Sequence, residues 1–422
     1  MKIMKKKIQI SHSRGNENTR GVVRGLYEKQ MLQSYVVSVA VFANDKCYSL
    51  LRKNLFNIFL RRELPVYLKK YTVQFPYKEL ICQLVCRLKS WSFVNFLWKY
   101  YSFDKVSEYI DECASKHLKQ NSKKIDAVYC FENEAVRTFE MAKVLGKKCI
   151  YDLPIGYWRL LHELLGKEKE IHPEWSITID ALSDSEEKIL NKEKEIQLAD
   201  VIFVASSFTK ESLSLYPGQL PPIIVVPYGF PSVNDNRTYS LDEKRKIKLL
   251  YVGGLTQRKG LSYMFEALEG LEADYELTIV GGGDIDSCLA LKNALDKHRY
   301  LATKSHDEVL KLMSESDIFI FPSLFEGFGL VITEAMSQGT PVITTDRTCA
   351  PDIITDGEDG WIVDAASADS IKNLLLKLRN DRQKIVSVGK SARETARNRP
   401  WLVYQEEMAD KITELFSTKT KH

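Results

Sequence analysis

Two glutamates separated by seven residues, Glu326 and Glu334, stand on either side of a glycine-containing turn. Carboxylates accept paired hydrogen bonds from neighbouring hydroxyl groups, and both a sugar ring and a ribose offer such pairs. If one continuous helix began at Glu326, Glu334 would lie about 12 Å further along its axis. This is longer than the roughly 5 to 9.5 Å between the paired carboxylates of a glycosidase. The spacing therefore favours holding two ends of one elongated ligand over acid and base catalysis at a single bond.

The residues around this turn predict an anion site. An apolar run precedes Gly327 and Gly329. A helical pattern then runs from near Phe328 to Gly339, and glycine is the favoured residue just past a helix end. The first N–H groups of a helix have no internal partner, and the helix dipole adds positive charge there. Because glycines let the main chain approach a ligand closely, we expect a diphosphate to bind at this helix start.

A second group of candidate residues follows a predicted strand at 248–253. Gly253 and Gly254 lead into a basic pair, Arg258 and Lys259. Two cations at the mouth of a strand-to-helix turn neutralise charge that develops on a departing nucleoside diphosphate, and this stabilisation needs no metal. A basic pair in a loop is often only a solvated turn. Beside the two glutamates, the stabilising role is the favoured interpretation.

The sequence around the glutamates, PSLFEGFGLVITEAMSQGTPVI, resembles the retaining GT-B glycosyltransferases of family 4, also called glycosyl transferases group 1. The resemblance is specific from about residue 248 to 364 and looser over the rest of the chain. It implies that Glu326 contacts hydroxyls of the transferred sugar and that Glu334 binds the ribose of the nucleotide. It also implies that Lys259 is the family's lysine and that the donor's sugar and phosphates contact three turn amides, those of Phe328, Gly329 and Leu330.

The chain departs from the family pattern at Gly254, where relatives commonly carry the arginine. We therefore assign the arginine role to Arg258 as a prediction. A further glycine turn includes Gly282 and resembles the family's next donor-binding turn. It is followed by Asp284 and Asp286, whose spacing is that of a metal-binding pair in another glycosyltransferase fold. Acids are common at helix starts because of the helix dipole, so we predict that they open a helix and that no metal binds.

The first half carries weaker signals. Gly15 and Asn16 lie in a loop after the first predicted strand, where they either form a tight turn or line the cleft beside the donor phosphates. Asp152 ends another predicted strand, at the edge where open α/β sheets bind ligands. Many relatives carry a histidine near this point, and Asp152 is our catalytic candidate, with turn capping as the alternative. Ser207 or Thr209 is predicted to cap the next helix.

Short β-branched runs alternate with helical patterns along most of the chain, which is typical of parallel strands joined by helices. The predicted class is α/β with two Rossmann-like domains facing across a cleft. We predict an acceptor-binding domain at 1–230, a nucleotide-sugar-binding domain at 231–397 and a terminal helix at about 398–418 that packs back on the first domain. The predicted strands lie at 7–10, 35–42, 127–131, 148–153, 201–205, 223–227, 248–253, 276–280, 318–322, 341–344 and 360–363.

The amino-acid composition of the chain limits the kinds of partner and cellular location that we expect. The 422 residues have a formal net charge of only +4, so the whole molecule does not indicate a nucleic-acid partner. The eight cysteines are scattered without CxxC pairs, and they indicate reduced thiols and a cytoplasmic protein. Polar residues interrupt the basic N-terminus where a signal peptide would be apolar, and no run of about 18 apolar residues follows elsewhere.

The segment 51–105 is unusually basic, with eleven Lys and Arg residues against three acids. Six aromatic residues, Trp91, Phe93, Phe96, Trp98, Tyr100 and Tyr101, follow one another closely at its end. Such a mixture suits contact with anionic lipid headgroups, which would place a cytoplasmic protein on the inner face of the membrane. The alternative is a pair of ordinary amphipathic helices whose aromatics pack into the first domain.

Taken with the resemblance, these patterns predict a retaining, metal-independent glycosyltransferase of the hexosyltransferase type. It would use a nucleotide-sugar donor and a glycan or lipid-linked acceptor in surface polysaccharide biosynthesis. The nucleotide sugar is a substrate, so no cofactor is expected. Two alternatives stay open: a nucleotide-sugar epimerase or hydrolase of the same fold, and a non-catalytic sugar-binding scaffold subunit.

Overall fold

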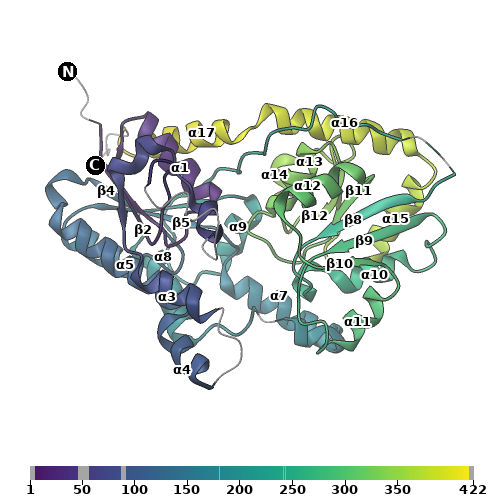
Figure 1. Ribbon diagram of the computed structural model, residues 1–422, viewed down its shortest axis with the longest axis horizontal. Coiled ribbons are helices and arrows are strands. Elements are labelled where there is room, and N and C mark those ends of the chain that lie inside the picture. Colours follow the sequence, from purple (N-terminus) through teal and green to yellow (C-terminus); the bar gives the residue numbers. More distant parts are fainter. Residues whose placement is uncertain are drawn as a thin grey trace.

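The computed structural model describes residues 5–45, 57–86, 92–179, 181–240, 242 and 244–417. It contains two parallel β-sheets, each flanked by helices (Figure 1). One sheet is built from the first half of the chain and the other from the second half. The two sheets belong to separate halves of the molecule, as the alternating pattern of strands and helices predicts.

The first sheet has seven parallel strands in the order β3-β2-β1-β4-β5-β6-β7. After β1 the chain moves outward through β2 and β3, then returns to β4 on the other side, which makes the β1–β4 boundary a topological switch point. Its strands are β1 (Ile8–Ser11), β2 (Leu32–Val37), β3 (Thr72–Gln74), β4 (Ala127–Phe131), β5 (Lys148–Leu153), β6 (Val201–Val204) and β7 (Ile223–Val225). The main helices are α1 (Glu17–Glu28), α3 (Tyr77–Val85), α4 (Ser92–Tyr101), α5 (Phe103–Gln120), α6 (Val136–Val144), α7 (Trp158–Ile171), α8 (Glu186–Leu198) and α9 (Ser207–Ser212).

The second sheet has six parallel strands in the order β10-β9-β8-β11-β12-β13, so its switch point lies between β8 and β11. Its strands are β8 (Ile247–Val252), β9 (Tyr275–Val280), β10 (Arg299–Leu301), β11 (Ile318–Phe321), β12 (Val342–Thr345) and β13 (Trp361–Val363). Its helices are α10 (Leu261–Leu268), α11 (Leu289–Leu295), α12 (His306–Glu315), α13 (Leu330–Ser337), α14 (Ala350–Ile353), α15 (Ala368–Leu378) and α16 (Arg382–Asn398). The strands β11 and β12 are buried along their whole length, as both faces of a parallel sheet are covered.

Three details differ from the predicted elements. The two edge strands β3 and β10, of three residues each, have no counterpart among the predicted strands. The strand predicted at 35–42 is wrong at both ends, because β2 begins at Leu32 and ends at Val37. Beyond β2 the chain leaves the sheet, and Val41 forms only an isolated bridge with Glu63.

The chain passes between the two halves twice, and the two crossings lie side by side. The N–H of Phe230 donates to the carbonyl oxygen of Arg399 at 2.9 Å. Beyond this point the terminal helix α17 (Trp401–Glu414) packs on α1, along the top of the view in Figure 1. At Gly25 an added Cβ would lie 2.2 Å from the carbonyl oxygen of Gln405, so the two helices approach too closely for a side chain there.

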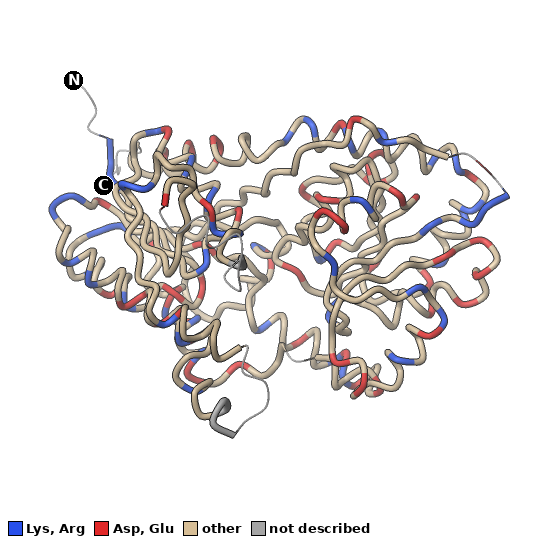
Figure 2. Tube along the Cα trace, viewed as in Figure 1, with Lys and Arg blue, Asp and Glu red and all other residues tan. Residues whose placement is uncertain are grey.

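Basic and acidic residues are interspersed over both halves of the molecule (Figure 2). The cysteines whose positions the structure describes are free thiols. Among the described helices, none has the length and apolarity needed to cross a membrane.

Candidate functional site

The predicted cations and the first glutamate meet at the switch point of the second sheet. Arg258 and Lys259 lie on a short 3-10 turn, η6 (Gln257–Lys259), that follows β8, and Glu326 lies in the turn that follows the neighbouring strand β11. The N–H of Leu324 donates to the carbonyl oxygen of Arg258 at 2.9 Å, which joins the two turns. Open α/β sheets bind their ligands at this position, outside the carboxyl ends of the strands.

Glycine at position 260 makes this approach possible. Gly260 has a φ of +70°, a conformation that residues with a side chain rarely adopt. A Cβ added there would lie 2.0 Å from the carbonyl oxygen of Pro322, in the turn after β11. Any other residue would therefore push the two turns apart.

Glu326 forms ion pairs with both cations. Its Oε1 contacts Nζ of Lys259 and lies 3.1 Å from Nη1 of Arg258. Ser323 Oγ donates to the same oxygen at 3.1 Å, and Arg258 also donates to the carbonyl oxygen of Phe325 at 2.7 Å. The three charged side chains are only 10 to 22% exposed, so their interaction is weakly screened by water.

Burial has a clear effect on Lys259. Desolvation, together with the neighbouring Arg258 guanidinium, lowers the pKa of Lys259 well below its usual value. Its ammonium group also lies 4.8 Å from the ring centre of Phe321, within the range of a cation–π contact. The contact with the Glu326 carboxylate favours the charged ammonium, because a neighbouring opposite charge stabilises it. The lysine is therefore held in a largely dehydrated position, where its charge interacts strongly with a neighbouring anion.

The helix after the glycine turn begins later than the sequence predicts. Helix α13 starts at Leu330, and Gly329 precedes it with a φ of +90°. Glu326 therefore lies in the turn outside the helix, and the condition for the 12 Å spacing estimate, a continuous helix from Glu326, is not met. Gly339, with a φ of +71°, follows the helix end as predicted.

The main chain at this helix start has free donors. Within the part of the chain that is described, the N–H groups of Phe328, Gly329 and Leu330 form no backbone hydrogen bond. The N–H of Leu330 is one of the first donors of α13, which have no partner within the helix, while those of Phe328 and Gly329 belong to the turn before it. The three N–H groups follow Glu326 within four residues, so the candidate amide donors, the two cations and the carboxylate belong to the same two connected turns.

The second glutamate lies within α13 and is mostly buried, with 19% of its side chain exposed. Desolvation raises the pKa of Glu334, and the nearby His306 opposes the change. Nδ1 of His306 lies 3.7 Å from Oε1 of Glu334. His306 opens α12, whose start is stabilised by a capping box of Ser305 and Glu308.

The three predicted glycines after β8 and β9 also come together. The N–H of Leu255, after Gly253 and Gly254, donates to the carbonyl oxygen of Gly282 at 2.9 Å. A Cβ added at Gly281 would lie 1.9 Å from the carbonyl oxygen of Gly253, so the two turns are in direct contact.

The prediction that Asp284 and Asp286 open a helix is wrong. They lie in a turn before α11, where Asp284 accepts a hydrogen bond from the N–H of Ser287 at 3.3 Å.

Gly15 and Asn16 lie at the switch point of the first sheet, after β1. Gly15 has a φ of +66°, and the N–H groups of Arg14 and Gly15 donate to Nδ1 of His12 at 2.9 and 3.0 Å. Asn16 precedes α1 but forms no capping hydrogen bond with its side chain. Asn18, two residues further, donates to the hydroxyl oxygen of Tyr228 at 3.1 Å.

Tyr228 connects this region to the donor-side turn, because its ring centre lies 4.7 Å from that of Phe328. Asp152, at the end of β5, belongs to the same aromatic surroundings. It is 4% exposed and accepts a hydrogen bond of 2.5 Å from the hydroxyl of Tyr129. Burial raises the pKa of Asp152 to about 7, although the bond from Tyr129 lowers it. The structure places Asp152 at the carboxyl end of β5 and encloses its carboxyl group.

Several contacts at this site were not predicted from the sequence. The carbonyl oxygen of Gly327 accepts hydrogen bonds from Ser206 Oγ at 2.6 Å and from Thr209 Oγ1 at 3.1 Å. Asp352 accepts from the N–H and the hydroxyl of Ser207 at 2.8 and 2.5 Å. Ser206, and not Ser207 or Thr209, provides the side-chain cap of α9. The first half of the chain therefore holds the glycine turn of the second half in place.

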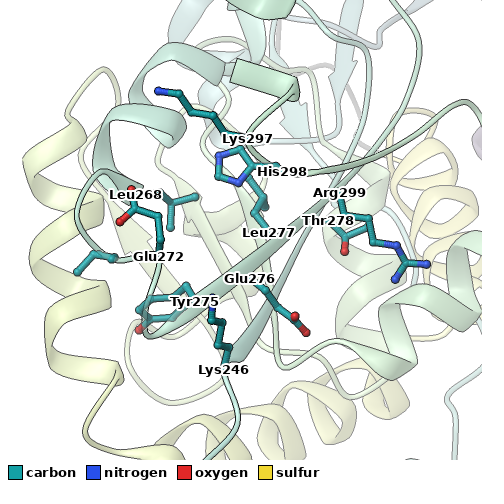
Figure 3. Close-up of a pocket in the computed structure, with 11 residues that line it drawn as sticks. Lys246, Leu268, Glu272, Tyr275, Glu276, Leu277, Thr278, Lys297, His298 and Arg299 are labelled. Atoms are coloured by element: carbon teal, nitrogen blue, oxygen red, sulfur yellow. The ribbon is translucent and has the colours of Figure 1, made fainter. Parts of the chain in front are cut away.

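Figure 3 shows a pocket of about 230 Å³ at the other end of the second sheet. Its lining comes from the amino ends of β8, β9 and β10 and includes Lys246, Glu272 and Arg299. This is the edge opposite the carboxyl ends, where α/β sheets bind ligands. The pocket therefore does not belong to the candidate site.

The match to a known protein family lies in the second half of the chain. Residues 233–395 match the family model described as glycosyl transferases group 1. A phosphatidyl-myo-inositol mannosyltransferase of Mycobacterium leprae is 31% identical over 179 residues, which are 40% of this chain and 46% of that protein. The amylovoran biosynthesis glycosyltransferase AmsK of Erwinia amylovora is 30% identical over 162 residues, 35% of this chain and 39% of that protein. The chain thus spans less than half the length of these two relatives.

Solved structures match over nearly the whole chain. Sucrose-phosphate synthase from Thermosynechococcus elongatus aligns with a TM-score of 0.63 at 16% identity, covering 98% of this chain and 100% of that one. The Anabaena protein HepE in complex with UDP and glucose aligns with a TM-score of 0.60 at 16% identity, with coverage of 98% and 100%. At this identity the likeness concerns the fold. The chain has the GT-B fold, with two Rossmann-like α/β domains.

Proposed function

We propose that this protein is a glycosyltransferase that moves a sugar from a nucleotide-sugar donor to a glycan or lipid-linked acceptor. The observation that supports it most is the meeting of Arg258, Lys259 and Glu326 at the switch point of the second sheet. The match of residues 233–395 to glycosyl transferases group 1 supports the same activity. HepE, of the same fold, is described in complex with UDP and glucose, which supports a nucleotide-sugar donor here.

In this proposal the donor diphosphate lies between the two cations and the free amides at the start of α13. Arg258 and Lys259 would then stabilise negative charge on the leaving diphosphate, which is a role for side chains in place of a metal ion. Glu326 is the counter-ion of both cations and would contact the sugar that the diphosphate carries. Glu334, further along α13, would hold the ribose.

Retention of the anomeric configuration is part of the proposal and follows from the motif resemblance. The leaving diphosphate accepts the proton of the attacking hydroxyl, so no separate side-chain base is needed. Asp152 stays a prediction: its raised pKa suits a proton acceptor near neutral pH, while its enclosure behind Tyr129 favours a positioning role. Metal independence is tested by activity in excess chelator.

The acceptor is proposed to bind on the first domain, beside Gly15 and Asn16. Relatives of the matched part include enzymes named for capsular polysaccharide and amylovoran biosynthesis, which suggests a surface polysaccharide or a lipid-linked precursor as the acceptor class. We also propose that the protein works in the cytoplasm, at the inner face of the membrane.

Exposed aromatic and apolar side chains on the first domain support membrane-surface contact. Part of the predicted segment 51–105 lies outside the described residues, namely 51–56 and 87–91. In the described part of this segment, eight large apolar or aromatic side chains are each more than one third exposed. They are Val66, Tyr67, Tyr77, Leu80, Leu84, Phe96, Trp98 and Tyr100. Basic residues of the same segment, such as Lys69, Lys70 and Lys99, suit an anionic lipid surface.

The test begins with calorimetric titration of UDP-, GDP- and ADP-sugars, followed by transfer assays with lipid-linked and oligosaccharide acceptors. Acceptor-dependent release of the nucleoside diphosphate supports the proposal. Rapid turnover of donor alone would instead indicate an epimerase or a hydrolase. Donor binding without transfer to any acceptor would indicate a scaffold subunit. This alternative stays open because Gly254 occupies the position where relatives commonly carry an arginine.

A further inference from the structure

One helix of the first half of the chain extends onto the second domain. Helix α7 begins beside the donor-side turn and runs between the two domains (Figure 1), and the short helix η4 (Pro173–Thr178) follows it. The Trp175 ring stacks on Phe265 of α10, with ring centres 5.9 Å apart. The carbonyl oxygen of Glu174 accepts a hydrogen bond from Sγ of Cys288 at 3.3 Å. The end of this α7–η4 bridge is therefore packed against the second domain.

The bridge ends in a buried polar network centred on Glu168 and Gln257. Glu168, on α7, is 3% exposed and accepts hydrogen bonds from Nε2 of Gln257 at 3.0 Å and from the hydroxyl of Tyr263 at 3.0 Å. Burial and the adjacent carboxylate raise the pKa of Tyr263, so its hydroxyl remains a donor. Thr178 Oγ1, on η4, accepts from the N–H of Gln257 at 2.9 Å.

Gln257 forms hydrogen bonds with residues of both domains. It is fully buried, and its Oε1 accepts from the N–H of Ser262 at the start of α10 at 3.1 Å. Its Nε2 also donates to Ser262 Oγ at 2.6 Å. Its carbonyl oxygen accepts from the N–H of Gly260 at 2.8 Å. The residue directly before the basic pair is thus fixed from both domains.

We propose that Glu168 is a positioning residue for the cation turn, acting through Gln257 on Arg258 and Lys259. Gln257 is the first residue of η6, and the two cations are the next two, so a change at Gln257 shifts both. The carboxyl group of Glu168 is buried and accepts from neutral donors, so its removal leaves the side-chain amide of Gln257 without this acceptor in a dry environment. The kinetic consequence of this inference rests on the proposed function. Its structural consequence, a less stable cation turn, does not depend on that function.

The structural consequence is tested by hydrogen–deuterium exchange of the unliganded full-length protein. In Glu168→Ala we expect the amides of Gln257, Lys259 and Gly260 to exchange about tenfold faster or more, because their hydrogen bonds open more often. Glu168→Gln keeps an acceptor and should restore most of the protection. The matched control is Glu163→Ala, an exposed glutamate on the same helix that pairs with Lys167, and it should leave the turn unchanged.

Kinetics distinguish positioning from a general loss of structure. For Glu168→Ala we expect kcat to fall about 10- to 100-fold while the donor KM changes by less than about threefold, because the cations act mainly as the diphosphate leaves. Thr178→Val, of similar volume, removes the other acceptor and should act in the same direction; it carries the test if Glu168→Ala does not fold. Unchanged exchange at the turn in both variants would overturn the proposal. Faster exchange in a protein without transferase activity would support the positioning role while removing the proposed function.

Discussion

Replacing Lys259 with methionine removes one positive charge from the site at nearly constant side-chain volume. Lys259 is 10% exposed at its side chain and contacts Glu326 directly. For two unit charges about 4 Å apart near a protein surface, the interaction energy is about 4 kcal/mol. Loss of one stabilising donor in a site of this kind commonly lowers kcat by about 10²- to 10³-fold. Arg258 still pairs with Glu326, so we expect a fall of about 100-fold.

The substitution should weaken binding of the substrate in its ground state less than it weakens stabilisation of the transition state. Charge on the diphosphate grows as the bond to the sugar breaks, so the donor KM should rise by less than about fivefold. Removal of a buried ion-pair partner can destabilise the protein, and a thermal unfolding curve must show that the variant is folded at the assay temperature. Lys248→Met, at an exposed position of β8, is the matched control and should keep normal kinetics. A Lys259→Met enzyme with kcat within threefold of the original would refute the role of Lys259.

Three further predictions concern other parts of the molecule. Glu334→Ala should weaken binding of the matching nucleoside diphosphate about tenfold or more, as hydrogen bonds to a charged group contribute about 1.5 to 3 kcal/mol; unchanged affinity in calorimetry would remove Glu334 from the site. The pKa of Asp152 is raised to about 7 from its usual 3.8, so the folded state favours the neutral carboxyl and loses stability as pH rises between these two values. Relative to the original protein, Asp152→Asn should therefore gain about 1.4 kcal/mol of unfolding free energy per pH unit between pH 5 and 7, with a plateau above, and a difference independent of pH in urea unfolding would contradict this. Changing Phe96, Trp98 and Tyr100 to serine should reduce sedimentation with anionic vesicles but not with neutral ones, and equal binding before and after the change would rule out these residues as a membrane contact.

Much of the fold follows from local sequence patterns. Buried parallel strands such as β4 and β11 are continuous apolar runs, and they lie where strands are predicted, at 127–131 and 318–322. The edge strands β3 and β10 were missed because each has only three residues, few of them buried, so no apolar run marks them. The start of α13 was placed two residues early because Gly329 adopts a left-handed conformation that the sequence alone does not reveal.

The site shows the same division between local and long-range information. Glycine turns, cations and glutamates carry a local signature, and residue types alone suggested that they bind one phosphate-containing ligand. The hydrogen bonds from Ser206 and Thr209 to Gly327, and from Gln257 to Glu168, join residues 89 to 121 positions apart. Such contacts depend on how the two domains are docked, and no single-sequence pattern encodes that arrangement. The enclosure of Asp152 behind Tyr129 was missed for the same reason.

A crystal structure of the full-length protein with its preferred nucleotide sugar would test the donor site directly. We predict that the diphosphate lies between the cation pair, Arg258 and Lys259, and the amides of Phe328, Gly329 and Leu330. The sugar should contact Glu326, and the ribose should contact Glu334. A nucleotide sugar bound elsewhere, with this turn making no contact to its phosphates, would contradict the proposed site.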